Sequence, residues 1–199
     1  VSLIVDTPTD FNSRVIREGI NVVDCVLYTH RHPDHVMGFT DLRGYARKKD
    51  APVSVYGNQK VLDVITNYYG GEDNCGKMFA LHVAGDRVVN IDGKLPVEAI
   101  SLKHGHEESE AVTGYIIDNK VAYFTDCVAL PDEVIDKVKG IPILILGCNT
   151  IQKDEPKKHM DMDDAVKYSE KVNPEELFLT HLSYKVDYYE LSKKLKSEK

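Results

Sequence analysis

Short apolar runs recur along the whole chain and predict β-strands. The predicted strands are Ser2–Val5, Cys25–Thr29, Val53–Tyr56, Val97–Leu102, Thr113–Ile117, Val121–Thr125, Ile143–Leu146 and a last strand that ends in Leu179-Thr180-His181. Between most of these runs, apolar residues recur at intervals of three and four, the spacing of an amphipathic helix. The predicted helices are a short one carrying Val15 to Arg17, one that starts at Asp34, and Lys60–Tyr69, Pro131–Val138, Met162–Val172 and Asp187–Lys199. Strands that alternate with helices indicate an α/β fold.

Some segments have clear end signals and one has none. Gly70-Gly71 ends the helix before it, and Asp118-Asn119-Lys120 supplies the turn of a hairpin. Asp161 is a suitable N-cap for the helix that follows it. The segment from Glu72 to Asp86 shows no clean period. We expect it to be either a loop or insertion near a binding site, or a plain surface loop.

Length and composition describe an ordinary globular protein. The 199 residues suit a single domain, 1–199, with 42% hydrophobic and 29% charged residues. No apolar run is long enough to cross a membrane. The net charge of -7 argues against nucleic acid as a partner, because a large phosphate footprint needs a basic face. It does not exclude a small anionic substrate, since bound metal ions supply local positive charge.

Four widely spaced cysteines favour a reducing compartment. Cys25 and Cys148 lie in apolar runs and are expected to be buried free thiols, and the chain has no Cys-x-x-Cys pair. This cysteine usage fits the cytoplasm better than a disulfide scaffold.

The most informative stretch is Thr29-His30-Arg31-His32-Pro33-Asp34-His35, which follows a predicted strand. Three imidazoles and a carboxylate within six residues suit borderline metals such as zinc, manganese or iron. The alternative is a solvated polar loop that happens to be rich in histidine. The carboxyl end of a strand is where α/β proteins tend to place their sites, which favours the metal.

Other candidate ligands also follow predicted strands. Lys103-His104-Gly105-His106 offers two histidines, and spacing alone does not choose between His104 and His106. Asp126 ends the second strand of the predicted hairpin, and a carboxylate there is able to bridge two cations. Cys127 is its rival, but adjacent strand residues face opposite sides, so only one of the two points inward. His181 ends the last strand.

The His-x-His-x-Asp-His pattern after an apolar strand resembles the signature of the metallo-β-lactamase-fold hydrolases. Further segments are similar to the PhnP-type cyclic phosphate phosphodiesterase branch. They are Arg17-Glu18-Gly19-Ile20, Gly38-Phe39-Thr40-Asp41-Leu42-Arg43, Thr125-Asp126-Cys127 with Leu130-Pro131, and Leu179-Thr180-His181-Leu182-Ser183. The resemblance covers nearly the whole chain. It implies an αββα sandwich, and a strand pair before residue 1 that this sequence does not show.

The resemblance also implies a dinuclear centre of two divalent ions, most simply zinc or manganese. The implied ligands are His30, His32 and His104 for the first metal, Asp34, His35 and His181 for the second, and Asp126 between them. It selects His104 over His106 and Asp126 over Cys127. Two cations roughly 3.5–4 Å apart hold a bridging hydroxide near neutral pH and clamp both oxygens of a displacement at phosphorus.

Two residues are candidates for catalysis. Asp34 is one, in addition to its role as a ligand. His159 is the other, because it matches a position that is a catalytic, non-ligand histidine in the phosphodiesterase branch. An imidazole is able to give a departing alkoxide its proton. The alternative for His159 is a solvent-exposed side chain after Lys157-Lys158.

We therefore expect a phosphodiesterase acting on a small, linear or cyclic, phosphodiester. One alternative is an endonuclease resembling tRNA 3′-processing enzymes, although the sequence shows no basic Gly/Pro-rich arm. Another is a thioester or lactam hydrolase, because the same fold supports many reactions. The expected partner is the small-molecule substrate. We expect no membrane association, and the protein is also considered as a homodimer.

Overall fold

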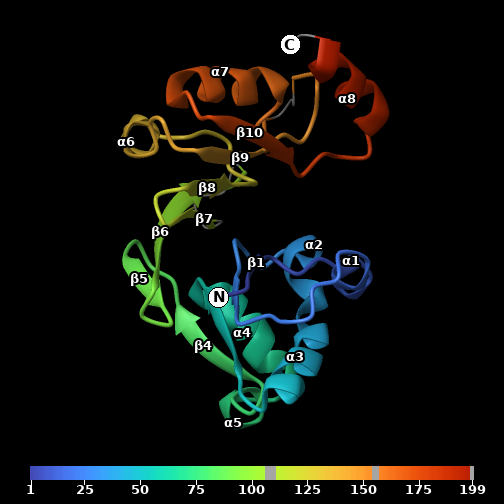
Figure 1. The fold of residues 1–199 in the computed structure, drawn as a ribbon, viewed down its shortest axis with the longest axis vertical. Helices are drawn as coiled ribbons and strands as arrows, with labels where there is room; N and C mark the ends of the chain where they lie inside the picture. Colours follow the sequence, from blue (N-terminus) through green and yellow to red (C-terminus); the bar gives the residue numbers. More distant parts are fainter. Residues whose placement is uncertain (106–110, 154–156, 198–199) are drawn as a thin grey trace. The chain divides into compact units, whose positions relative to one another are not determined.

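The computed structural model describes residues 1–105, 111–153 and 157–197. They form two compact units, residues 1–101 and 102–199. Figure 1 labels the helices and strands of each unit. One strand, β6 (Leu95–Lys103), begins in the first unit and ends in the second.

The first unit is built on a four-stranded parallel sheet. Its strands are β1 (Leu3–Val5), β2 (Cys25–Leu27), β3 (Val53–Gly57) and β4 (Phe79–Val83), and they lie side by side in that order. Because all four run the same way, their carboxyl ends share one edge of the sheet. Asp6 follows β1 at this edge, and the histidine-rich stretch follows β2. A hairpin of β5 (Val88–Ile91) and β6 comes after the sheet.

Helices of the first unit bury their apolar faces in one core. They are α1 (Phe11–Arg17), α2 (Pro33–Val36), the 3₁₀ helix η1 (Met37–Asp41), α3 (Leu42–Lys49), α4 (Gln59–Tyr68) and α5 (Glu72–Cys75). The core joins Phe11 of α1, Phe39 of η1 and Ile65 of α4 to strand residues such as Val55 and Phe79. Complete burial of such side chains contributes roughly 1.5–3 kcal/mol each relative to exposure.

Both expectations for residues 72–86 are wrong. This segment contains α5 and then β4, which pairs with β3 over five residues and completes the parallel sheet. Only Phe79 of β4 is buried, and the side chains become more exposed toward Val83. An edge strand of this kind shows neither strict alternation nor a continuous apolar run, so its pattern is weak.

The helix predicted from Asp34 onward is broken into α2, η1 and α3. Gly38 lies in η1 and packs directly on the loop before α1. A Cβ atom at this position would lie 2.3 Å from the Pro8 carbonyl oxygen and 2.7 Å from Phe11 Cβ. The Gly38 amide also donates to the Thr7 carbonyl at 2.8 Å. The apolar spacing of three is therefore a real helical face, carried by a tighter 3₁₀ turn.

The second unit contains β7 (Ala111–Ile117), β8 (Val121–Phe124), β9 (Ile143–Gly147) and β10 (Glu176–Thr180). The hairpin β7–β8 is antiparallel, while β9 pairs in parallel with both β8 and β10. Its turn residues Asp118 and Asn119 both have left-handed backbones, with φ of 52° and 51°, as the predicted turn chemistry requires.

Three helices complete this unit: α6 (Asp132–Lys137), α7 (Met162–Val172) and α8 (Tyr188–Ser197). The bounds of α7 and its Asp161 N-cap are confirmed, and α7 lies beside β9 and β10 (Figure 1). Among the described residues, none of the helices combines the length and the hydrophobicity that a bilayer crossing needs.

Candidate metal ligands in each unit

The histidine-rich loop of the first unit gathers its candidate ligands at the carboxyl end of β2. The His30 ring lies 4.4 Å from the His32 ring and 4.2 Å from the His35 ring, centroid to centroid. Pro33 at the start of α2 turns the chain, so that Asp34 and His35 lie in its first turn. His35 Nε2 lies 3.3 Å from a carboxylate oxygen of Asp34. Asp34 and His35, which the family resemblance assigns to the second metal, therefore lie close together.

Asp6, a residue that the sequence reasoning did not select, orients this loop. Its carboxylate is buried and accepts from the Thr29 amide, the Thr29 hydroxyl and His35 Nδ1, each at 2.8 Å. Burial raises the pKa of Asp6, although the bonds from His35 and Thr29 oppose that shift. An Nδ1–H that is bound to a carboxylate makes Nε2 the nitrogen that is able to bind a metal.

Thr29 orients the His30 ring in the same way, through a hydrogen bond to its Nδ1. Its hydroxyl donates to Asp6, so its oxygen is the acceptor for His30 Nδ1, which lies 3.0 Å away. Asp6 therefore orients His35 directly and His30 through one hydroxyl. The signal in the sequence was the position of Asp6 directly after an apolar strand, whereas the pairing of that strand with β2 is seen only in the structure.

Asp126 is the central acidic residue of the second unit. It is buried two residues after β8, and its backbone is left-handed, with φ of 57°. One carboxylate oxygen lies 2.9 Å from His181 Nε2 and 3.3 Å from His159 Nε2. The other oxygen accepts from the Thr125 hydroxyl at 2.8 Å. One oxygen of Asp126 thus lies close to two imidazoles. This position is consistent with the bridging ligand that the resemblance implies.

His104 is held by the backbone of the same residue. Its Nδ1 donates to the Asp126 carbonyl oxygen, which again makes Nε2 the metal-binding nitrogen. His106, the alternative ligand, lies outside the described residues. In this unit His104, Asp126 and His159 place one potential ligand atom each within 4.8 Å of one another.

His159 and His181 complete the cluster of the second unit. The His159 ring lies 5.3 Å from the His104 ring and 5.3 Å from the His181 ring. About a fifth of each of the two side chains, His159 and His181, is exposed. His181 directly follows β10, and the Asn149 side-chain amide lies 3.4 Å from its Nδ1. His159 is partly buried here, whereas the alternative interpretation was a solvent-exposed side chain.

Cys127 is poorly suited to be the rival ligand. The side chain is completely buried, and burial, followed by the charge of Asp126, raises the pKa of its thiol to about 12. A thiol has to lose its proton to bind a metal. The contacts of the carboxylate and the burial of the thiol both favour Asp126.

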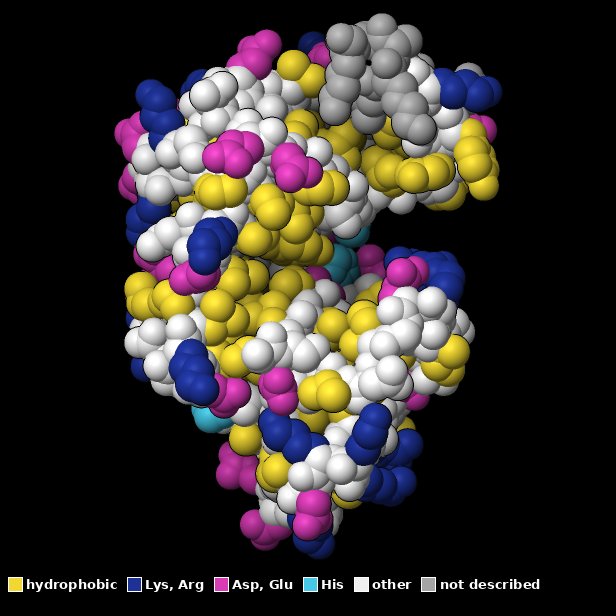
Figure 2. Space-filling model, viewed as in Figure 1, with side chains coloured by type: hydrophobic (Ala, Val, Ile, Leu, Met, Phe, Trp, Pro, Cys, Tyr) yellow, Lys and Arg dark blue, Asp and Glu magenta, His cyan; other side chains and the backbone are white. Residues whose placement is uncertain are grey.

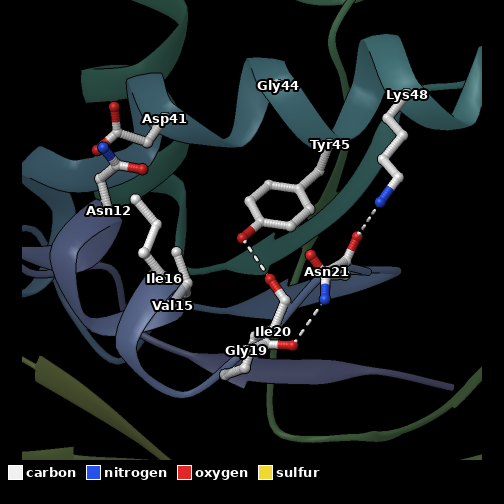
Figure 3. Close-up of a pocket in the computed structure, with 10 residues that line it drawn as sticks. All are labelled: Asn12, Val15, Ile16, Gly19, Ile20, Asn21, Asp41, Gly44, Tyr45 and Lys48. Carbon is white, nitrogen blue, oxygen red and sulfur yellow. Dashed lines mark hydrogen bonds between the residues drawn. The ribbon is translucent and has the colours of Figure 1, made fainter.

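Two other features of the first unit lie away from these ligands. A pocket of about 350 Å³ lies between α1, α3 and residues 19–21 (Figure 3). Its dashed contacts are internal: Tyr45 donates to the Ile20 carbonyl and Lys48 to the Asn21 carbonyl. These two hydrogen bonds hold the loop of residues 19–21 against α3.

The second feature is a group of basic side chains over α3 (Figure 2), which are Arg43, Arg47, Lys48 and Lys49. Lys49 pairs with Asp24 at 3.0 Å. His82 stacks on Tyr56 of β3 with ring centroids 4.6 Å apart.

The donor sets fit divalent metal ions. Each unit offers imidazoles together with at least one carboxylate, and His30, His35 and His104 are held through Nδ1. Zinc and manganese sites are built from such nitrogen and oxygen donors.

Comparison with known proteins places the chain in one family. The β-lactamase superfamily domain matches residues 3–182. A relative from Porphyromonas gingivalis, named octanoyltransferase, is 28% identical over 92% of this chain and 37% of its own length. A relative from Bacillus anthracis, named exodeoxyribonuclease YycJ, is 29% identical over 66% of this chain and 46% of its own length. The chain thus spans less than half of each curated relative.

Solved structures agree with the family. A diphosphatase of the PhnP family is 26% identical and superimposes with a TM-score of 0.82, over 96% of this chain and 73% of its own. Zn²⁺-bound PqqB from Methylobacterium extorquens superimposes with a TM-score of 0.73 at 13% identity, over 97% of this chain and 79% of its own. The second likeness supports the fold alone. With its matching domain, sheets and histidine-rich loop, the chain belongs to the β-lactamase superfamily and has the metallo-β-lactamase fold.

Proposed function

We propose that this protein is a metal-dependent hydrolase, and that it is a phosphodiesterase that cleaves a small, linear or cyclic, phosphodiester. Its two divalent ions, zinc or manganese, are held by the ligands that the family resemblance assigns, with His30, His32 and His104 on one ion and Asp34, His35 and His181 on the other. Asp126 serves both. The likeness to the diphosphatase of the PhnP family supports a substrate that contains phosphorus.

The observation that carries the proposal is the position of His159. Its Nε2 lies 3.3 Å from the same Asp126 oxygen that His181 approaches at 2.9 Å. The resemblance gives His181 to the metals and leaves His159 outside the ligand set. This proximity supports the proposed role of His159 as an acid–base group beside Asp126, which is what cleavage of a poor alkoxide leaving group needs.

Each part of the site has a separate task in this proposal. Bound divalent ions supply Lewis acidity and a nucleophile at neutral pH. Asp6 holds His35, and Thr29 holds His30, in one tautomer. His159 gives its proton to the departing oxygen. Asp34, whose side chain is 65% exposed, remains a candidate for contact with substrate as well as metal.

A nuclease is the second candidate, because one relative is an exodeoxyribonuclease. The net charge of -7 and the partial neutralisation of the α3 basic group by Asp24 argue for the small substrate. A thioester or lactam hydrolase is the third candidate, since the fold hosts many reactions.

A substrate panel tests the proposal. Purified protein loaded with zinc or manganese is assayed with bis(p-nitrophenyl) phosphate, p-nitrophenyl phosphate, a 2′,3′-cyclic nucleotide, single-stranded DNA, a tRNA precursor and a lactam. We expect the small diesters to be cleaved fastest and the monoester much more slowly. Preferential cleavage of DNA or RNA would establish the nuclease instead, and lactam cleavage the third candidate.

His159→Ala tests the residue that carries the argument. It should keep both metals and lose roughly 10²–10⁴-fold in kcat on an alkyl diester. The loss should be much smaller on bis(p-nitrophenyl) phosphate, because p-nitrophenolate leaves without a proton. His82→Ala is the matched control, since His82 is an exposed histidine stacked on Tyr56. Loss of a metal in His159→Ala would make His159 a ligand.

We also propose that the chain is a single hydrolase domain, that it is located in the cytoplasm and that it forms a homodimer. All four cysteines are buried free thiols, which supports a reducing compartment. Light scattering of the purified protein measures its mass and decides between monomer and dimer.

A further inference from the structure

The loop that carries His159 is closed at its base by backbone pairing. The Asn149 amide donates to the Met160 carbonyl at 2.9 Å, and the Met162 amide donates to the Thr150 carbonyl at 3.0 Å. Thr150 and Asp161 form a parallel bridge between the two stems. These bonds fix the two ends of the loop, at β9 and at α7. Near His159 they hold the chain that follows it, at Met160 to Met162, and not the chain just before it.

A second anchor lies on the other side of His159 and uses Asp164 of α7. One oxygen of Asp164 accepts from the Asp161 amide at 3.2 Å and from Lys157 Nζ at 2.7 Å. The Asp161 carboxylate in return accepts from the Asp164 amide at 3.0 Å, which completes a capping box. A single carboxylate oxygen therefore connects the chain two residues before His159 with the chain two residues after it.

The environment of this ion pair differs from that of an ordinary surface pair. The Asp164 side chain is 13% exposed and the Lys157 side chain 41%. Burial works to lower the pKa of Lys157, but the hydrogen bond and charge of Asp164 outweigh it, so the pKa is raised. A partly shielded pair of this kind has a more defined geometry than an exposed one.

We propose that Lys157 is a positioning residue, which holds His159 beside Asp126 by tying the loop to Asp164. The inference rests on the proposed role of His159 as the proton donor. Without the tie, the backbone from Lys157 to His159 would still be held after His159 through Met160 and Asp161, but it would lose its contact with α7 before His159. His159 would then spend less time within reach of Asp126 and of a leaving group, and a misplacement of about 1 Å costs on the order of 10²-fold in rate.

The test compares Lys157→Met and Lys157→Arg with Lys171→Met. Met keeps most of the length of Lys without its charge, and Arg keeps the charge. Lys171 makes a similar Lys–Asp pair with Asp132, at 3.2 Å, between α7 and α6. We expect Lys157→Met to lose about 10–100-fold in kcat on an alkyl diester with little change in KM. Lys157→Arg should recover most of it, and Lys171→Met should match the parent.

Two further readouts separate positioning from a general structural effect. On bis(p-nitrophenyl) phosphate, Lys157→Met should lose little activity, as His159→Ala does. In a His159→Ala background, Lys157→Met should cause no additional loss, because its only route to the reaction is removed. Metal content and Tm should stay near those of the parent. An additive loss in the double variant would show that Lys157 acts elsewhere, and parent-like activity of Lys157→Met on the alkyl diester would end the proposal.

A measurement without substrate keeps the inference separate from the proposed function. Amide hydrogen exchange over residues 157–161 should become faster in Lys157→Met than in Lys171→Met. Unchanged exchange overturns the anchor, whatever the protein cleaves. Faster exchange together with full activity of His159→Ala on alkyl diesters overturns the proposed role of His159 and therefore the positioning role, and leaves only the structural tie.

Discussion

Asp6 and His35 are 29 residues apart in sequence, and the Asp6 carboxylate accepts the His35 Nδ1–H at 2.8 Å. The contact joins the residue that follows β1 to helix α2 and fixes the tautomer of a candidate metal ligand. Mutation of such partners of metal-binding histidines typically costs about 10–100-fold in metal affinity or activity.

Asp6→Asn should weaken metal binding by about 10–100-fold while the fold is kept. Asn tolerates the left-handed backbone of Asp6, whose φ is 59°, but its amide is a weaker acceptor for His35 and Thr29. Competition with a chelator of known zinc affinity measures the effect. Asp24→Asn is the control, because Asp24 pairs with Ser2 and Lys49 away from the ligands. Equal zinc affinities in Asp6→Asn and the parent would contradict the orienting role.

Asp126→Asn should reduce the metal content from two equivalents to one or fewer. The substitution removes the carboxylate charge but keeps the carbonyl that holds His104 and suits the left-handed backbone. Elemental analysis after dialysis gives the count. Cys127→Ala should retain both metals. The opposite pattern, with loss in Cys127→Ala alone, would assign the site to the thiolate.

Gly38→Ala should destabilise the protein by about 1–3 kcal/mol, the usual cost of overpacking. The added Cβ would meet backbone and core atoms of residues 7 to 11, which have little room to move. Gly44→Ala, in the helical part of α3, meets nothing within 4 Å and should stabilise by roughly 0.5–1 kcal/mol. Urea unfolding measures both, and equal effects would show that the contact at Gly38 relaxes freely.

Stability should fall at alkaline pH because of two buried thiols. Burial, then nearby aspartates, raises the pKa of Cys25 to about 12 and that of Cys148 to about 11, from 9.0. The unfolded state loses these protons first, so their contribution is complete below pH 9 and is lost as pH rises toward 11–12. The difference in unfolding free energy between the parent and a Cys25→Ala, Cys148→Ala variant should therefore shrink over this range. A constant difference would contradict the prediction.

Local patterns in the sequence predict much of the fold. Helix α7 has the predicted bounds because Asp161 caps it and its apolar face is regular, and the turn at Asp118-Asn119 follows from its residue types. Strand β4 could not be predicted, since its edge position leaves most of its side chains partly exposed. The break around η1 depends on a tertiary contact of Gly38, which has no local signature.

For the site, the sequence predicts the residue types but not their supports. The dense spacing of His30 to His35 is a local signal, so the stretch is recognisable without a structure. Asp6 is a single carboxylate far from it, and Lys157 contacts Asp164 across a loop. These relationships arise from strand order and from loop closure, which only the folded chain determines.

Three residues that end strands share a left-handed backbone: Asp6, Asp126 and His181, with φ of 59°, 57° and 57°. Among the described residues other than glycine, positive φ otherwise occurs only at aspartate and asparagine. Short polar side chains tolerate this conformation best, and bulky or β-branched ones are strongly disfavoured. In a laboratory selection for a different metal or reaction, these three positions should therefore tolerate far fewer substitutions than Asp34 and His35, which lie in a helix. Substitutions that change the metal or the reaction should accumulate in the loop after β2.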